Sequence, residues 1–302
     1  MRLAVAATPD VAIPALDWLL NSKHEIATII TQPDRPVGRG RTLSPTIVSR
    51  WASEHSVPVF KPAHPNELQG LLSQLDLVIT IGYGVLLPVE ILSIPRHGFL
   101  NLHFSLLPAY RGAAPAQRAL ENGESATGVT VFQLDKGMDT GPIFTQKTIV
   151  IDPRWRSLEL LQHLSILGVS ALSDALEMIE SGQSPTPQVG TFSLAPKISK
   201  EQARLDFSLT AHGVVNRIRA FTPSPGSWTV WSGEVFKISN AIVAQGDGMQ
   251  PGQIFIKESA IFVQCGEESA IELLEVTPSG KKEMSAIDWS RGARLIGGEY
   301  FG

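Results

Sequence analysis

The chain has 302 residues, of which 43% are hydrophobic and 18% are charged, and its formal net charge at pH 7 is -4. This composition excludes an intrinsically disordered protein, and the negative charge argues against a generally basic nucleic-acid binder while leaving room for a local basic patch. The length exceeds what one hydrophobic core normally supports, so we expect two domains.

Strand-length apolar runs alternate with helical patterns through the first third of the chain. The predicted strands are residues 3–7, 26–31, 57–60, 75–81 and 99–103, and the predicted helices are residues 11–22, 46–55 and 66–73. Hydrophobicity along the strands is continuous rather than alternating, which indicates that both faces of the sheet are covered. The order therefore predicts an α/β domain with a Rossmann-like, doubly wound and mostly parallel sheet.

Two more strands, over residues 129–134 and 143–151, and a long helix with heptad-like spacing over residues 157–179 complete this domain. We place the first domain over residues 1–189.

A stretch rich in Pro, Ser and Gly predicts an interdomain linker over residues 190–207. Beyond it, a helix over residues 210–221 precedes several short strands separated by turn residues. This pattern predicts a second, small domain over residues 208–302, built as a β-barrel or a β-sandwich.

Loops after the strands narrow the chemistry, because a doubly wound sheet binds ligands at the carboxyl ends of its strands. The loop after the first strand lacks the GxGxxG pattern of dinucleotide-binding enzymes. The chain also has no GxxxxGK[ST] phosphate loop and no GxSxG nucleophile elbow. These absences argue against nicotinamide-dependent enzymes, kinases and esterases.

A polar pair, Asn101 and His103, stands at the end of a predicted strand. Alternate side chains of a strand share a face, so both should project to one side while the apolar neighbours pack on the other. Asp139 lies in a glycine-bracketed GMDTG turn that could carry its carboxylate back toward His103. An amide, an imidazole and an anion together suit attack of an amine on a carbonyl carbon without a protein nucleophile.

Each of these residues also has a structural explanation when it is taken singly. A histidine near a strand end is more often structural than catalytic, and Asp139 could simply satisfy amides of its own loop. Tyr83 could belong to the core rather than to a ligand wall. Only the combination of these residues makes the prediction of an active site specific.

The string NLHFSLLPAYRGAAPAQRAL, followed downstream by GVTVFQLDKGMDTGPI, resembles the signature of the folate-dependent formyltransferases. The resemblance implies a formyl transfer from 10-formyltetrahydrofolate, in which Asn101 and a protonated His103 hold the oxyanion and Asp139 supports His103 and relays a proton through water. It also implies folate contacts from two loops, at Ser105, Leu106, Leu107 and Pro108 and at Gly82, Tyr83 and Gly84.

The family resemblance leaves the acceptor open, because relatives formylate glycinamide ribonucleotide or sugar nucleotides, and one branch hydrolyses the donor. Residues 31–45 look like the family's tRNA-contacting loop, in which Arg35, Arg39 and Arg41 outnumber Asp34 and glycines let the loop fold on binding. Without the resemblance, this segment could equally be an ordinary solvated loop.

The carboxyl-terminal segment resembles the OB-like β-barrel domain of the tRNA-modifying branch, which is compatible with nucleic-acid binding through Arg217 and Arg219. We therefore expect the acceptor to be methionyl initiator tRNA, in translation initiation. A sugar-nucleotide or other small-amine formyltransferase is the same-fold alternative. A non-catalytic tRNA-binding protein is the alternative from another class.

The apolar runs, the amino terminus, the single cysteine and the histidines predict the location of the protein and its metal content. No apolar run approaches the roughly 20 residues that a membrane-spanning helix needs, and the amino terminus is typical of a buried strand rather than a secretory signal. A lone cysteine, Cys265, can form neither an internal disulfide nor a Cys-based metal site. The seven histidines show no metal-binding spacing. We expect a cytoplasmic monomer without a metal.

Overall fold

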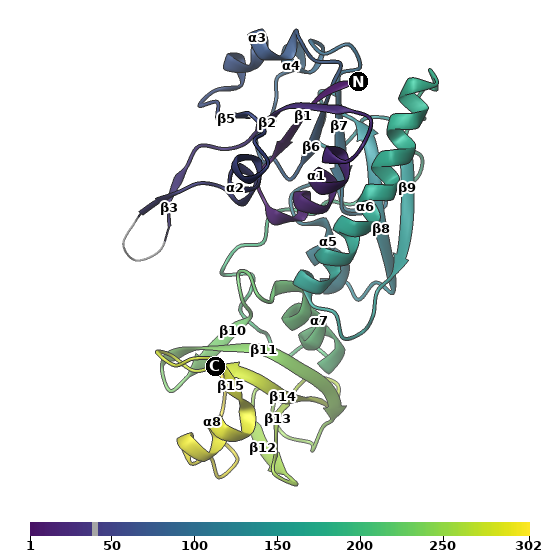
Figure 1. The fold of residues 1–302 in the computed structure, drawn as a ribbon. Coiled ribbons are helices and arrows are strands. Elements are labelled where there is room, and N and C mark those ends of the chain that lie inside the picture. Colours follow the sequence, from purple (N-terminus) through teal and green to yellow (C-terminus); the bar gives the residue numbers. More distant parts are fainter. Residues whose placement is uncertain (38–41) are drawn as a thin grey trace. The chain divides into compact units, whose positions relative to one another are not determined.

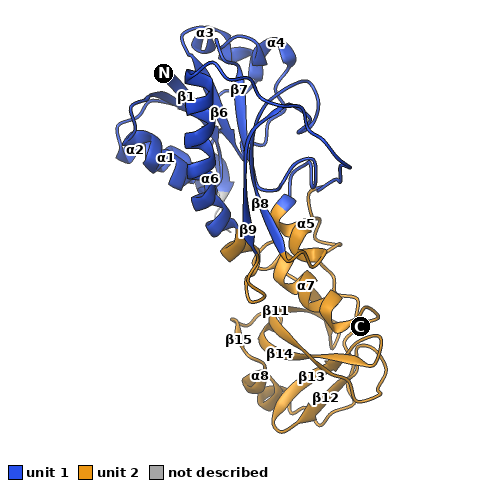
Figure 2. Ribbon diagram, turned by 90° about the vertical axis from the view of Figure 1, so that its right-hand side faces the viewer, with its two compact units in different colours: residues 1–115, 126–150, 161–196 blue, residues 116–125, 151–160, 197–302 orange. Residues whose placement is uncertain are grey.

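The computed structural model describes residues 1–37 and 42–302. The chain forms two compact units, coloured separately in Figure 2. The first unit comprises residues 1–115, 126–150 and 161–196, and the second comprises residues 116–125, 151–160 and 197–302. The segment predicted as a linker is thus divided between the units, and the predicted boundaries at 189 and 208 stay predictions.

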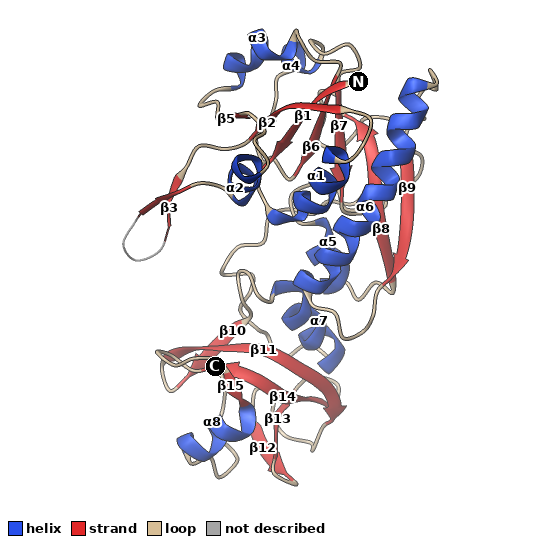
Figure 3. Cartoon of the chain, in the orientation of Figure 1, coloured by secondary structure: helices blue, strands red, loops and turns tan. Residues whose placement is uncertain are grey.

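One seven-stranded sheet forms the centre of the first unit (Figures 1 and 3), with the strand order β5-β2-β1-β6-β7-β8-β9. Its strands are β1 (Arg2–Ala7), β2 (Glu25–Ile30), β5 (Val59–Phe60), β6 (Leu77–Ile81), β7 (Phe99–His103), β8 (Ala126–Gln133) and β9 (Ile143–Val150). The first five strands in this order pair in parallel, and β8 and β9 are antiparallel additions. The predicted mostly parallel α/β sheet is confirmed.

Helices cover both faces of the parallel part of this sheet, which explains why the central strands β1 and β6 are buried along almost their whole length. The helices of this unit are α1 (Ile13–Leu20), α2 (Ile47–Glu54), α3 (Gln69–Leu72), α4 (Val89–Leu92) and most of α6 (Ser157–Glu180), with short 3-10 turns at Asp10–Ala12 and Pro65–Leu68. Helix α5 (Pro115–Glu121) belongs to the second unit from its second residue onward. On one face, Leu72 and Ile91 share a core with Phe99. On the other face, Leu102 packs so closely on α6 that a Cβ at Gly168 would lie 2.6 Å from its side chain.

The segment after β2 differs from the loop that the sequence predicts. Arg35–Val37 (β3) and Thr42–Ser44 (β4) pair as an antiparallel ribbon that extends away from the sheet (Figure 1). Strands this short, with a proline and no alternating pattern, give no recognisable signal in the sequence. Arg39 and Arg41, two of the predicted tRNA contacts, lie outside the described residues.

The second unit contains an antiparallel sheet with the order β10-β11-β14-β13-β12, and β15 pairs with β14. Its elements are α7 (Ala211–Phe221), β10 (Trp228–Trp231), β11 (Glu234–Gln245), β12 (Ile254–Lys257), β13 (Ala260–Gln264), β14 (Ser269–Thr277), β15 (Met284–Ser285) and α8 (Ala286–Ala293). Val214 and Ile218 of α7 are buried in the core of this unit. The predicted C-terminal β domain with one preceding helix is confirmed, whereas β15 and α8 were not predicted.

Cys265 is buried in this second core, and burial raises the pKa of its thiol to about 12. The thiol is therefore unreactive near neutral pH. Among the helices of the described residues, none is both long and apolar enough to cross a membrane.

Candidate active site

β7 carries the polar pair in the middle of the sheet, between β6 and β8. Asn101 pairs with Thr80 of β6, and His103 pairs with Thr130 of β8. Because side chains two residues apart share a face, both project to the same side as the buried Phe99. Among the described residues the Asn101 carboxamide has no hydrogen-bond partner, so its amino group is available to a ligand.

The imidazole of His103 is held by a hydrogen bond at Nε2, while Nδ1 faces a carboxylate. Nε2 lies 2.9 Å from the backbone carbonyl oxygen of Tyr110, and since a carbonyl only accepts, Nε2 carries the proton. In the neutral ring the lone pair of Nδ1 is then directed toward Asp139, whose Oδ2 lies 3.8 Å away. The rings of His103 and Phe132 also lie nearly perpendicular to each other, with 6.3 Å between centroids.

Burial lowers the pKa of His103 below its ordinary value of 6.5, although the Asp139 charge and the Tyr110 carbonyl act to raise it. The resting imidazole is therefore neutral at neutral pH, whereas the family resemblance implied a protonated His103. The difference arises because only 5% of the residue is exposed, so a resting cation would lose most of its hydration. A neutral Nδ1 is a base, and it becomes an acid only after it has taken up a proton.

Asp139 reaches His103 on a loop that doubles back along the sheet. β8 ends opposite Leu100, near the start of β7, so residues 134–142 must return toward the end of β7. The turn is tight, because a Cβ at Gly141 would lie 1.8 Å from the carbonyl oxygen of Gln133. The Asp139 carboxylate then accepts a hydrogen bond of 2.7 Å from the backbone N–H of Gly112. The predicted proximity of Asp139 and His103 is confirmed, and their catalytic roles are proposals.

The predicted folate loop after β7 is held mainly from inside. Ser105 is fully buried, and its hydroxyl donates to the carbonyl oxygen of Ala109 at 2.6 Å. Leu107 is 3% exposed, and its backbone N–H donates to the Thr130 hydroxyl. Ser105 and Leu107 thus shape the loop, while Leu106 and Pro108 present accessible surface. Direct folate contacts by these residues stay predictions.

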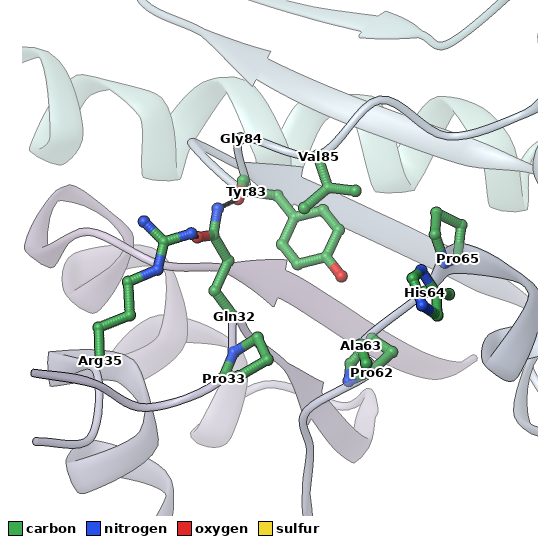
Figure 4. A pocket seen from close by; sticks show the side chains of 10 residues that line it. All are labelled: Gln32, Pro33, Arg35, Pro62, Ala63, His64, Pro65, Tyr83, Gly84 and Val85. Carbon is green, nitrogen blue, oxygen red and sulfur yellow. Dashed lines mark hydrogen bonds between the residues drawn. The ribbon is translucent and has the colours of Figure 1, made fainter. Parts of the chain in front are cut away.

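The loop after β6 forms one wall of a pocket of about 300 Å³ (Figure 4). Gly82 and Gly84 both have positive φ, and a Cβ at Gly82 would lie 2.7 Å from Pro9, so the predicted backbone excursion is confirmed. The ring of Tyr83 is 5% exposed and packs in the core, while its carbonyl oxygen accepts a hydrogen bond from Gln32 at 2.9 Å. The other walls come from the loops after β2 and β5.

The arginines predicted to bind tRNA are not equivalent in the structure. Arg35 is exposed on β3, where its guanidinium donates to the side-chain oxygen of Gln32. Arg217 pairs with Glu121 at 2.9 Å, and Arg219 donates to the carbonyl oxygen of Trp155 at 2.8 Å. Burial also lowers the pKa of Arg219. Arg217 and Arg219 therefore stabilise the second unit, and their contact with tRNA stays a prediction.

Metal ligation has no support in the described part of the chain, where no three or more His, Cys, Asp or Glu side chains group as ligands.

Acidification should remove stability through His103. Because its pKa is lowered on folding, the unfolded chain binds the proton more readily, so this stabilisation is complete above about pH 6.5 and is lost as the pH falls through the folded pKa. His24, whose pKa burial also lowers, acts in the same direction. In urea titrations between about pH 7 and pH 5, the free energy of unfolding should fall more steeply for the wild type than for His103→Gln. Parallel pH profiles would contradict a buried neutral imidazole.

Two family models match the chain: "Formyl transferase" over residues 1–176 and "Formyl transferase, C-terminal domain" over residues 197–294. The chain belongs to the formyl transferase family.

Similar members of the formyl transferase family match along the whole chain. The methionyl-tRNA formyltransferase of Salinispora tropica is 42% identical over 307 residues, covering 99% of each chain. That of Streptomyces coelicolor is 42% identical over 311 residues, covering 100% of each chain.

Solved structures show the same fold at lower identity. The methionyl-tRNA formyltransferase from Clostridium thermocellum has a TM-score of 0.58 at 16% identity, over 88% of this chain and 100% of that one. WlaRD, a sugar 3N-formyl transferase, has a TM-score of 0.68 at 18% identity, over 93% of this chain and 99% of that one. HypX from Aquifex aeolicus, in complex with tetrahydrofolic acid, has a TM-score of 0.66 at 18% identity, and this chain spans 46% of its length.

Proposed function

We propose that this formyltransferase transfers a formyl group from 10-formyltetrahydrofolate to the α-amino group of methionyl initiator tRNA, the step that prepares the initiator for translation. The observation that carries the proposal is the arrangement on one face of the sheet. An unpartnered Asn101 amide stands two residues from a neutral His103, whose free Nδ1 faces the Asp139 carboxylate at 3.8 Å. These groups can stabilise an oxyanion and move a proton, and none of them is a nucleophile that must be acylated.

The acceptor is chosen by two further observations. Relatives matched over 98% or more of both chains at about 42% identity are named methionyl-tRNA formyltransferase, whereas the sugar formyltransferase of similar fold is 18% identical. The exposed β3–β4 ribbon with Arg35 extends from the same unit as the site, where it can meet a phosphate backbone. Both favour the tRNA over a sugar nucleotide.

The protein has an exposed apolar surface beside the site that could bind the flat ring of the formyl donor. Leu86, in the loop after β6, is 85% exposed, and Met138, beside Asp139, is 57% exposed. These apolar side chains lie in the loops that flank the polar pair, and covering them with a ring would remove them from water. We therefore keep the folate contacts at Gly82, Tyr83, Gly84 and Ser105–Pro108 as part of the proposal. The bound donor supplies an activated formyl carbon and a nitrogen leaving group.

Asn101, His103 and Asp139 have separate roles in the formyl transfer. The Asn101 amino group donates to the carbonyl oxygen as negative charge develops on it. Nδ1 of His103 takes the proton that the attacking amine must lose, and the imidazolium so formed is stabilised by Asp139 and by the Tyr110 carbonyl. His103 finally returns this proton to the leaving nitrogen. One proton is accepted and one is released, so His103 ends neutral as it began.

The three groups come from one chain, so the reaction needs no second subunit, and we propose a monomer. We also propose a cytoplasmic location, where charged initiator tRNA is used.

The proposal is tested by offering the purified full-length protein several acceptors with 10-formyltetrahydrofolate. We expect N-formylmethionyl-tRNA from charged initiator tRNA and no product from uncharged tRNA or from a nucleotide-linked aminosugar. Formylation of the aminosugar alone would assign the chain to the sugar-nucleotide branch. Binding of tRNA without formylation of any acceptor would support the non-catalytic alternative.

A further inference from the structure

A segment that follows α6 is bonded along the loop that holds His103. This strap, residues 188–195, pairs through its backbone with Arg111: the Arg111 N–H donates to Ser193 at 2.9 Å, and the Ala195 N–H donates to Arg111 at 2.7 Å. The Ser193 hydroxyl accepts from the backbone N–H of Tyr110 at 2.9 Å. The strap therefore fixes the backbone of Tyr110, whose carbonyl oxygen bonds His103, and of Arg111, which precedes Gly112. The Gly112 amide is the group that bonds the Asp139 carboxylate.

Gln188, the first residue of the strap, connects this loop to the Asp139 loop. Its Nε2 donates to the carbonyl oxygen of Asp139 at 2.8 Å and to that of Gly141 at 2.9 Å. Its Oε1 accepts from Nε and Nη2 of Arg111 at 3.2 and 2.7 Å. A carboxamide offers two N–H donors and one oxygen with two lone pairs, so Gln188 uses its full hydrogen-bonding capacity.

The Asp139 backbone needs such support. Its φ of +54° lies in the left-handed region, which a residue with a Cβ adopts only where the surroundings hold it. The carboxylate is too far from His103 for a direct hydrogen bond, so its place depends on the Gly112 amide and on its own backbone. Gln188 bonds that backbone at two carbonyls, and through Arg111 it bonds the neighbouring loop.

We propose that Gln188 is a positioning residue, which fixes Asp139 beside His103 by cross-linking the Asp139 loop to the His103 loop. The inference rests on the proposed formyl transfer for its kinetic consequence, but its geometric part stands without turnover. Displacing a reacting group by about 1 Å costs up to about 10²-fold in rate. Loss of Gln188 should therefore lower kcat and leave acceptor binding unchanged.

Three variants separate this role from general destabilisation. Gln188→Met keeps the length of the side chain and removes all four hydrogen bonds. Gln188→Glu keeps the acceptor for Arg111 but loses the donors to the two carbonyls. Gln183→Met is the matched control, because Gln183 is exposed and its Nε2 bonds the Ser181 hydroxyl at 2.9 Å.

We expect Gln188→Met and Gln188→Glu to lower kcat about 10- to 10²-fold with KM for methionyl-tRNA within about twofold, and Gln183→Met to change neither. Because Gln188 acts through Asp139, adding Gln188→Met to Asp139→Asn should lower kcat no further than Asp139→Asn alone. Additive losses in the double variant, or wild-type kcat in Gln188→Glu, would overturn the proposal.

A measurement without substrate distinguishes failure of this inference from failure of the proposed function. The Asp139 charge raises the pKa of His103, so moving Asp139 away in Gln188→Met should lower that pKa further, as measured by NMR titration of the imidazole. An unchanged imidazole titration would refute positioning even in an active enzyme. A wild-type protein that formylates no acceptor, but shows the shift, would refute only the proposed function.

Discussion

Replacing His103 by glutamine should lower kcat for formyl transfer by about 10²- to 10⁴-fold, the usual contribution of a general acid–base group. Glutamine is neutral and of similar size, so it fills the buried site, but it cannot accept a proton from the amine and return it to the leaving nitrogen. KM for both substrates should stay within about twofold, because the imidazole transfers a proton during the reaction and does not contribute to binding of the substrates in the ground state. Steady-state kinetics with methionyl initiator tRNA measure both constants.

The matched control is His55→Gln, at an exposed position after α2, which should leave kcat unchanged. Circular dichroism of His103→Gln should match the wild type. Wild-type kcat in a folded His103→Gln protein would show that His103 does not transfer the proton.

Replacing Asn101 by alanine should lower kcat by about 10²- to 10³-fold, as removal of one oxyanion donor does in other acyl transfers. The Asn101 amide has no partner among the described residues, so its truncation leaves no protein group newly unpaired. The rate loss should therefore come without an equal loss of stability. Asn101→Asp should be at least as slow, because it replaces a donor by a negative charge next to the developing oxyanion.

The kinetic constants of Asn101→Ala separate two explanations for the role of the Asn101 amide. If the amide acts mainly on the developing charge, kcat and kcat/KM fall together in Asn101→Ala. A raised KM with unchanged kcat would show that Asn101 only holds the ground state, and the assignment of the oxyanion donor would be wrong.

The sequence predicts the scaffold of the site well because local patterns determine it. The apolar run with an Asn and a His predicts β7 over the residues that the structure assigns to it, Phe99–His103. The glycine-bracketed turn predicts the approach of Asp139 to His103. Both depend on alternation and turn chemistry, which neighbouring residues carry.

Long-range contacts account for what the sequence does not predict. Gln188 lies 49 residues from Asp139 along the chain, in a stretch whose Pro, Ser and Gly content is typical of a spacer. The neutral resting state of His103 depends on how deeply the following loop buries it. Arg217 suggested a basic tRNA-binding helix, but its partner Glu121 comes from a distant segment.

The central claim is that the substrate amine attacks the formyl carbon directly while Asn101, His103 and Asp139 handle charge and protons. A rapid-quench experiment with excess enzyme and a radiolabelled formyl donor tests it in one turnover. We expect the label to pass to methionyl-tRNA as the donor is consumed, with none on the denatured protein at any time, whether or not the acceptor is present. Label bound covalently to the protein before it reaches the tRNA would contradict direct attack and the roles assigned to all three residues.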